Sequence, residues 1–447
     1  MEKQTAKIDR SKFLNDFTSY WREREDILLK ILVILGLLLH ISFLISLKTG
    51  WWDPYFHAGI KKIAKAEDFF AIYVAGNELL NRRSIYPVEK SIVDGEERYV
   101  RTPYQPDDEN MPVNPAPFRY LPTAAYAAVT LTLFTPWTAY YLWVILYEIL
   151  FFTSILILGF HYKSMRGMHI AAALYLFFTP WYPEIFIGQH SFLQSVFILG
   201  MLCAILSGKP GRTAGWWITS VLWKINTAIC LPAFIRWRKW GAVIWLFVIL
   251  VVTCIPYFLY HREDIAKFIA MNFRPVECAY SGNFGFQGLL AKILIKFGHD
   301  ETSAARIIAI IATVAMFTLI SLVTTILARR DRFGECVCLW ITTSFLIYQD
   351  VWEHHFVMLL PIVAYLYLKR PGRFLWFTWL LMALPTTHRL FYDNFQSIRD
   401  TGLPLYGPGA THFWNVWHYT LIKPVGLLML FGYCVYVTIG RNVRKSD

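Results

Sequence analysis

The sequence predicts an all-α polytopic membrane protein, a bundle of about 10–12 transmembrane helices with interfacial helices in a long first outer loop. Three observations lead to this fold class. Hydrophobic residues make up 56% of the 447 residues. Charged residues make up only 17%, whereas a soluble domain usually contains about 25%. Apolar runs long enough to cross a bilayer recur along the chain, and its mean hydropathy is +0.40.

The first apolar run, "ILLKILVILGLLLHISFLISL" at 27–47, is long enough to span a membrane. It follows a polar segment, 1–26, that contains six Lys or Arg residues. The run lacks the small-residue cleavage site of a secretory signal peptide. We therefore expect a retained anchor, with residues 1–26 as a cytoplasmic tail.

Basic residues occur in short clusters between later apolar runs, a pattern typical of cytoplasmic loops. The clusters are Lys163 with Arg166, Lys209 with Arg212, Arg236 with Arg238 and Lys239, Arg329 with Arg330 and Arg332, Lys369 with Arg370 and Arg373, and Arg441 with Arg444 and Lys445. This distribution explains the formal net charge of +12 and argues against nucleic-acid binding. Residues 49–118 show the opposite bias, eleven Asp or Glu against eight Lys or Arg, and are expected to form the outer loop.

Further spans are expected where a sufficiently long apolar run connects a loop on the cytoplasmic side with a loop on the outer side. They are 137–160, 168–184, 189–206, 240–259, 303–328, 334–349, 355–368, 373–390 and 417–439. Residues 119–134 are expected to stay at the outer interface, and 214–235 to form a re-entrant pair of half-helices. We expect one transmembrane domain at 27–390, and a segment at 391–447 with an outer loop, the last span and a cytoplasmic tail.

Two parts of the chain give little functional signal. The stretch 88–117 contains five prolines and is expected to be irregular, and its acidic part at 92–114 suggests no role. The seven cysteines are scattered and predict no disulfide framework. Cys336 and Cys338 are too close together for the usual zinc pair.

Asp68 is the leading candidate for chemistry in the outer loop. In "AEDFFAIYVAGNELLNRRSIYP" (66–87), the side chains of Phe69, Ile72, Tyr73, Gly76 and Leu80 share one helical face, which predicts an interfacial helix. An acid at its start can favour the helix N-terminus electrostatically. It can also act as a general base, partly desolvated by the aromatic residues that follow it.

Four further candidates lie in two motifs expected at the outer side. In "FRYLP" (118–122), Arg119 and Tyr120 suit either an interface anchor or a clamp on a phosphate. In "YPEIFIGQHSFL" (182–193), the residues Gly188, Gln189 and His190 interrupt an apolar run. Gln189 and His190 suit either a polar loop or the binding of sugar hydroxyls.

The remaining candidates lie near later spans. Lys224, in "VLWKINTAICLP", must snorkel, pair or meet an anionic ligand at membrane depth. "YQDVWEHHFVMLLP" (348–361) holds the acids Asp350 and Glu353 and two histidines, His354 and His355. Adjacent side chains on a helix point about 100° apart, so we expect no metal site there. The histidines either pair with these acids or bind a substrate phosphate or sugar, and Glu353 is grouped with them as a candidate substrate-binding residue.

The motifs of nucleotide-driven pumps and serine hydrolases do not occur in the sequence. A carboxylate, histidines and cations at the outer boundary suit transfer of a group from a lipid-linked phosphate donor, with no nucleotide and no cofactor expected. A transporter or lipid flippase could use the same charges, but the asymmetric first loop and the lack of a visible repeat argue against it. A non-catalytic subunit for envelope assembly is the third hypothesis.

The chain resembles the GT-C integral-membrane glycosyltransferases, most closely glycosyltransferase family 87. The resemblance rests on the order of "DFFAIYVAGNELLNRRSIYP", "FRYLPTAAY", "GQHSFL", "WKINTAICLP" and "VWEHHFVMLLP". It departs from the family at the turn, which more often reads Gly-Gln-x-Asn, and after the lysine, where a proline often follows.

The resemblance implies a GT-C-like bundle with an outward-facing site and Asp68 as the catalytic residue. It implies that His354 or His355 lies near the donor phosphate, and that the transfer is inverting and needs no nucleotide-sugar or metal ion. The implied donor is a polyprenyl-phosphate sugar, with mannose as the expected sugar, and the acceptor is a lipid-linked or envelope glycan. The chain has no Asn-x-Ser/Thr sequon, which favours a prokaryotic inner membrane with the site facing the periplasm or exterior.

Overall fold

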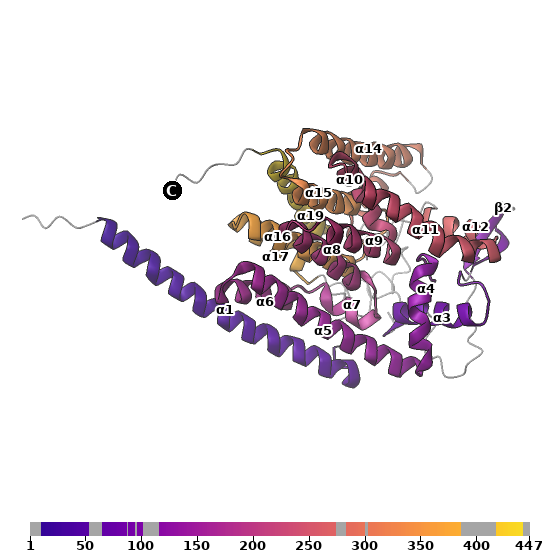
Figure 1. Ribbon diagram of the computed structural model, residues 1–447, viewed down its shortest axis with the longest axis horizontal. Helices are drawn as coiled ribbons and strands as arrows, with labels where there is room; N and C mark the ends of the chain where they lie inside the picture. The colour runs from indigo at the N-terminus through magenta and orange to yellow at the C-terminus, as the bar shows by residue number, and fades with distance from the viewer. Residues whose placement is uncertain are drawn as a thin grey trace, which may run out of the picture.

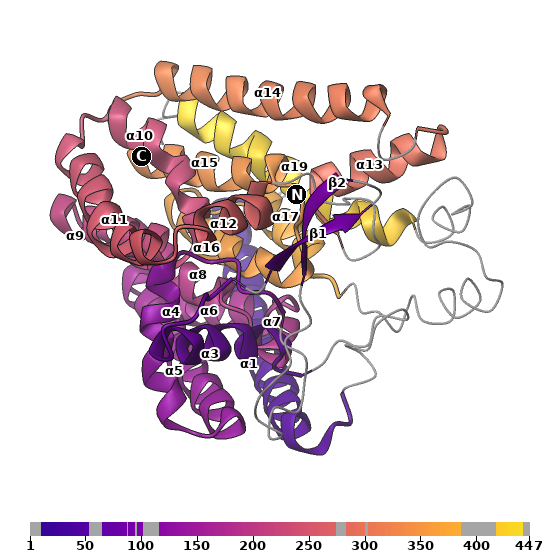
Figure 2. The same ribbon diagram turned by 90° about the vertical axis from the view of Figure 1, so that its right-hand side faces the viewer.

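The computed structural model describes residues 10–52, 65–86, 88–93, 96–101, 116–273, 283–299, 303–385 and 417–440. The described residues form a helical bundle with one two-stranded hairpin (Figure 1). The predicted all-α polytopic class is therefore confirmed. We call the end of the bundle that carries α3, α4 and α12 the loop side; it lies at the right of Figure 1 and faces the reader in Figure 2.

Five described helices are long and apolar enough to cross a membrane. They are α1 (Arg10–Thr49), α5 (Pro136–Tyr162), α11 (Trp240–Tyr260), α14 (Ala304–Leu327) and α19 (Trp417–Ile439). The helices α6 (Met165–Leu176) and α7 (Trp181–Ile187) are bent by 54° and would count as a sixth span together. Helix α1 begins at Arg10, well before the expected span at 27–47. The chain is an integral membrane protein.

The other expected spans are shorter helices inside the bundle. They are α8 (Ser191–Leu206), α15 (Phe333–Ile347), α16 (Leu360–Lys369) and α17 (Arg373–Ala383). In α15, residues 334–343 are all buried, and in α16, residues 360–366 are buried. These helices are shorter than the roughly 20 residues that a bilayer requires. In α15 and α16 most apolar side chains are covered by neighbouring helices, whereas α17 exposes Phe374, Phe377 and Leu380.

Two expected interruptions of the helical pattern are present. Residues 119–134 form α4 (Pro122–Ala128) and η1 (Val129–Leu133), which are too short to span. The helix α9 (Pro210–Trp223) is separated from η2 (Ile225–Cys230) and α10 (Leu231–Arg236) by Lys224. Lys224 has an extended backbone, with φ −147° and ψ 116°, which breaks the helix at this residue.

The prediction that 88–117 is irregular is wrong for its first part. Strand β1 (Val88–Val93) pairs antiparallel with β2 (Glu96–Arg101), with Val93 opposite Glu96. The strands contain β-branched and aromatic residues, and the sequence between them is Asp-Gly, the pair that two-residue hairpins favour. The rest of the acidic stretch, 102–114, and the expected loop at 391–416 lie outside the described residues.

Helix α3 (Glu67–Leu80) confirms the helix expected after the first span. It packs against α4, η1, α5 and α7, so that most of its apolar residues contact protein. Gly76 permits the closest approach, because a Cβ there would lie 2.9 Å from the Ala128 carbonyl carbon. The helix α12 (Asp264–Phe273) also lies on the loop side (Figure 2), and α13 (Phe286–Lys296) packs against α14, α15 and α19.

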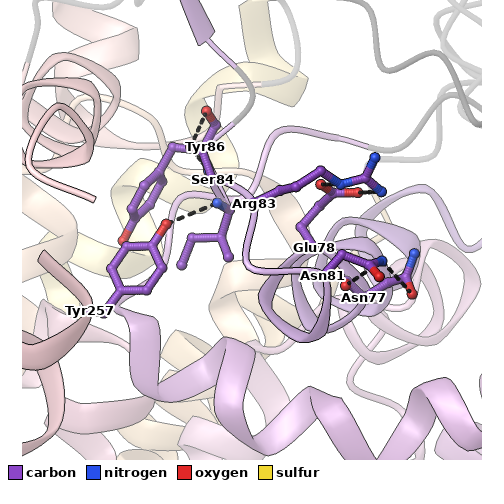
Figure 3. A network of polar contacts seen from close by, with 8 residues as sticks. Asn77, Glu78, Asn81, Arg83, Ser84, Tyr86 and Tyr257 are labelled. Carbon is purple, nitrogen blue, oxygen red and sulfur yellow. Dashed lines mark hydrogen bonds and ion pairs between the residues drawn. The ribbon is translucent and has the colours of Figure 1, made fainter. Parts of the chain in front are cut away.

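Polar contacts hold the end of α3 and the chain after it (Figure 3). Asn81 Nδ2 donates to the Asn77 carbonyl oxygen at 3.0 Å, and Arg83 Nε lies 2.7 Å from Glu78 Oε2. The backbone N–H of Ile85 then donates to the Tyr257 hydroxyl on α11 at 2.9 Å. The segment that follows α3 is therefore attached to a membrane-spanning helix.

Six of the seven cysteines lie in the described residues, and none of these six forms a disulfide. They are Cys203, Cys230, Cys254, Cys336, Cys338 and Cys434. Five of the six are buried, as expected for residues of the membrane core.

Candidate active site

The carboxylate of Asp68 lies in the first turn of α3 and is held by the side-chain amide of Gln189. Gln189 Nε2 donates to Asp68 Oδ2 at 3.1 Å. The Oε1 atom of this amide accepts from the Tyr120 hydroxyl at 2.8 Å and from the backbone N–H of His190 at 2.8 Å. A carboxylate only accepts hydrogen bonds, so the network defines the amide orientation. The structure thus brings together four predicted site residues from three segments.

Burial and the nearby Asp68 raise the pKa of Tyr120 well above its ordinary value. The phenol is therefore protonated at neutral pH and donates to Gln189. Asp68 itself is only partly buried. The hydrogen bond from Gln189 orients its carboxylate.

The turn between α7 and α8 approaches the start of α3 closely. Helix α7 ends at Gly188, whose φ is +68°, in the left-handed region that glycine adopts readily. A Cβ at this position would lie 2.4 Å from Phe69 Cβ. The backbone N–H of Ala66 donates to the Phe186 carbonyl oxygen at 2.9 Å. The residue at 188 must therefore be glycine-sized, because any Cβ would collide with Phe69. Phe69 directly follows Asp68, so this close approach also fixes the backbone that carries the Asp68 side chain.

His190 is fully buried in an aromatic enclosure. The ring centroids of Tyr120, Trp143 and Trp223 lie 5.0–5.8 Å from its own. His190 Nε2 lies 3.3 Å from the carbonyl oxygen of Asp68, which can only accept, so Nε2 carries the proton. Burial lowers the pKa of His190 to about 3, and the imidazole is neutral at physiological pH. His190 thus supports the backbone of the candidate base.

Glu184 is a further residue of this turn that the sequence analysis did not single out. Its side chain is fully buried, and Oε1 accepts from the backbone N–H of Phe192 at 2.6 Å. Its carbonyl oxygen accepts from the backbone N–H of Gln189 at 2.9 Å. Glu184 therefore caps the first turn of α8. Glu184 could have been recognised in the sequence as the one acid within the apolar stretch at 182–193.

Lys224 lies between α9 and η2, and its side chain contacts the first turn of α8. Lys224 Nζ donates to Ser191 Oγ at 3.0 Å and lies 5.9 Å from the Tyr120 ring centroid. The Lys224 carbonyl oxygen accepts from Gln194 Nε2 at 2.8 Å. The extended backbone at Lys224 thus places an ammonium group beside the residues that hold Asp68.

Arg119 lies next to Tyr120 and contributes the second cation. Its Nη1 atom lies 3.5 Å from Asp350 Oδ2. The Arg119 side chain is 41% exposed, whereas the Asp350 side chain is 12% exposed. Among the described residues this long contact is the only ion pair of Arg119, and its side chain is partly exposed. This geometry suits the binding of an anion such as phosphate.

His354 and His355 lie in η3 (Glu353–Leu359), which packs against α7, α8 and α16. Their ring centroids are 4.4 Å apart, with the rings at 78° to each other. Burial, followed by the Lys224 ammonium, lowers the pKa of both imidazoles well below the ordinary value. The two histidines therefore share the electrostatic environment of Lys224.

The two histidines differ in their hydrogen bonding. His355 Nδ1 accepts from the Trp352 backbone N–H at 3.2 Å, which leaves the proton on Nε2. His354 Nε2 is buried and has no hydrogen-bond partner within the described part of the chain. The two imidazoles thus differ in how the protein engages them: Nδ1 of His355 accepts from the backbone, whereas Nε2 of His354 has no partner among the described residues.

Glu353 forms an ion pair that the sequence analysis did not predict. Its Oε1 atom lies 3.2 Å from Lys423 Nζ on α19. The sequence groups Glu353 with the two histidines as a substrate-binding residue, which stays a prediction. Lys423 could have been recognised in the sequence, because a lysine within the apolar run 417–439 requires a partner.

The arrangement combines a base candidate with an anion site. Asp68 can accept a proton, whereas Lys224 and Arg119 can bind a negatively charged group. Across the described ranges, no group of three His, Cys, Asp or Glu side chains could hold a metal ion. The chemistry that these residues can perform on their own is proton abstraction beside a bound anion.

Comparisons with known proteins gave one match. The family model of glycosyltransferase family 87 matches residues 118–348, which is more than half of the chain. The matched region contains Arg119, Tyr120, Gln189, His190 and Lys224. Comparisons with curated proteins and with solved structures gave no match.

Proposed function

The chain belongs to glycosyltransferase family 87, and from that premise we propose that it transfers a sugar from a polyprenyl-phosphate donor to a lipid-linked or envelope glycan. The family indicates a glycosyltransferase, with a sugar donor and a glycan or lipid acceptor. The single observation that carries the finer proposal is the Gln189-held carboxylate of Asp68 beside the cation Lys224.

The proposed reaction is a single inverting displacement. Asp68 takes the proton of the acceptor hydroxyl, whose oxygen forms a bond to the anomeric carbon of the sugar. The bond from that carbon to the phosphate oxygen breaks on the opposite face, and the polyprenyl phosphate leaves with the electron pair. Lys224 and Arg119 stabilise the negative charge that grows on the phosphate. His354 and His355 donate neutral N–H groups to it.

The proposed orientation follows from charge. The basic clusters of the sequence are typical of cytoplasmic loops, whereas Asp68 follows the first span. We infer that the site faces the periplasm or exterior of a prokaryotic inner membrane, where nucleotide-sugars are absent. A polyprenyl-phosphate donor suits this side because its phosphate lies at the membrane boundary. Mannose is the sugar that we would test first.

The test is product formation by the purified protein in nanodiscs, with polyprenyl-phosphate-mannose and a lipid-linked mannoside as acceptor. We expect a glycosylated product in mass spectrometry, and a loss of about 10²–10⁴-fold in kcat for Asp68→Asn. Glu67→Gln is the matched control, because Glu67 is the adjacent acid in the same helical turn. Equal activity of wild type and Asp68→Asn would exclude Asp68 as the base.

A transporter or flippase would give a different outcome in the same system. It would move the donor across a vesicle membrane and form no covalent product. Donor flipping in proteoliposomes without any glycosylated acceptor, for each sugar tested, would contradict the proposed function.

A further inference from the structure

Lys423 on α19 is a completely buried cation with a full set of acceptors. Its exposed fraction is 0%. The ammonium lies 3.2 Å from Glu353 Oε1 and donates to the carbonyl oxygens of Met382 at 2.7 Å and Leu384 at 3.0 Å. An ammonium has three N–H donors, and these three acceptors match them. Lys423 therefore connects α19, the C-terminal end of α17 and the start of η3.

The end of α17 is a favourable place for this charge. Helix α17 ends at Ala383, and its last carbonyl groups accept no hydrogen bond from a backbone N–H within the helix. These carbonyls form the negative end of the helix dipole, which attracts a cation. Two of the three acceptors of Lys423 are of this kind, and Glu353 supplies the third. The ammonium is thus held independently of Glu353, and in turn holds the Glu353 carboxylate.

Glu353 is the first residue of η3 and directly precedes His354 and His355. The N-terminal end of η3 has another restraint, the hydrogen bond from the Trp352 backbone N–H to His355 Nδ1. The Glu353–Lys423 pair anchors the same turn from the side of α19. A displacement of Glu353 would therefore move both imidazoles relative to Lys224 and Arg119.

We propose that Lys423 is a positioning residue for the donor phosphate, which acts by holding η3 so that His354 and His355 face the anion site. This inference rests on the proposed function. Both Lys423 and Glu353 lie outside the region 118–348 that matches the family model. The machinery for donor binding would thus extend to the last helix of the chain.

A purely structural role predicts a different pattern of variants from a positioning role. In Lys423→Met, the partly buried Glu353 carboxylate loses the Lys423 ammonium, so the protein is destabilised. In Lys423→Met/Glu353→Gln, both charges of the pair are removed, so the melting temperature recovers toward that of wild type. The restraint on η3 is still missing in the double variant. Donor binding should therefore stay impaired after stability has recovered.

The experiment measures donor KM, acceptor KM and melting temperature for wild type and for both variants in nanodiscs. We expect the double variant to melt near wild type, with donor KM raised about tenfold and acceptor KM unchanged. Lys369→Met is the matched control, since Lys369 is an exposed lysine at the end of α16. A double variant with wild-type donor KM would overturn the inference while leaving the glycosyltransferase intact.

Binding of polyprenyl phosphate alone separates the two proposals. We expect the dissociation constant of the double variant to exceed that of wild type about tenfold. If wild type forms no product but the variant shows this weaker binding, the proposed function fails and the positioning role stands. If wild type and the double variant bind polyprenyl phosphate equally, or if neither binds it, Lys423 has no positioning role.

Discussion

Gln189 donates its amide Nε2 to Asp68 Oδ2 at 3.1 Å, while its Oε1 accepts from the Tyr120 hydroxyl. The two residues lie in different segments, and the amide links the first turn of α3 to the turn between α7 and α8. The carboxylate is therefore oriented before any substrate binds. Such preorganisation contributes to catalysis because no reorganisation is needed during the reaction.

Replacing Gln189 tests this preorganisation. Gln189→Met keeps the length of the side chain and removes the hydrogen bonds to Asp68 and Tyr120. A hydrogen bond to a charged group contributes about 1.5–3 kcal/mol, so we expect kcat to fall by about tenfold or more. Steady-state kinetics with saturating donor and acceptor measure the change. Gln194→Met is the comparison, since Gln194 Nε2 donates to the Lys224 carbonyl oxygen and not to Asp68. Unchanged kcat in Gln189→Met would refute the orienting role.

Removing the ammonium of Lys224 should affect the donor more than the acceptor. Lys224→Gln retains a hydrogen-bond donor for Ser191 and loses the positive charge. Because charge-assisted hydrogen bonds are stronger than neutral ones, we expect donor KM to rise about tenfold. Lys209→Gln, in a basic cluster at the start of α9, provides the control. An equal rise in acceptor KM would show that Lys224 does not act on the donor phosphate.

The glycine at 188 can be tested against a second glycine with a similar backbone. Gly188 has φ +68° and Gly208 has φ +62°, so alanine at either position costs about 1–2 kcal/mol for the left-handed conformation. Only at 188 would the new Cβ meet Phe69 Cβ, at 2.4 Å; at 208 it would meet nothing within 4 Å. Overpacking adds about 1–3 kcal/mol. Gly188→Ala should therefore melt at a lower temperature than Gly208→Ala, and equal melting temperatures would contradict the close approach.

The buried imidazole of His190 predicts a pH dependence of stability. Its pKa is lowered to about 3 in the folded state, whereas an unperturbed histidine titrates near about 6.5. The unfolded chain therefore binds more protons between these values, and stability rises with pH. The contribution is present above about pH 6.5 and is lost as the pH falls toward 3.

Melting temperatures of wild type and His190→Gln between pH 7.5 and about pH 4 measure this effect. We expect the wild type to lose more stability on acidification than the variant, because glutamine does not titrate. His169→Gln is the control, because it removes a histidine of α6 that is only partly buried. Parallel pH curves for wild type and His190→Gln would show that His190 is not neutral and buried as described.

Patterns in the sequence were sufficient where one local rule dominated. The interruption at Gly188 was visible from small and polar residues within an apolar run, and a pair of half-helices was expected at 214–235, where Lys224 lies. The hairpin at 88–101 was missed because prolines further along the stretch outweighed its β-branched residues and the Asp-Gly pair. Glu353 was grouped with the histidines on sequence proximity alone, and its partner Lys423 could not be found because it lies 70 residues further along the chain.

By itself, the sequence determined the membrane class, the helical character and several of the polar residues that the structure brings together. These features follow from hydropathy and from the cost of placing charges at membrane depth, which are local properties. Only the tertiary structure decided which residues meet: Gln189 with Asp68, Lys224 with Ser191, and Glu353 with Lys423. The physical reason is that each of these pairs joins separate helices, whose relative placement depends on packing across the whole bundle.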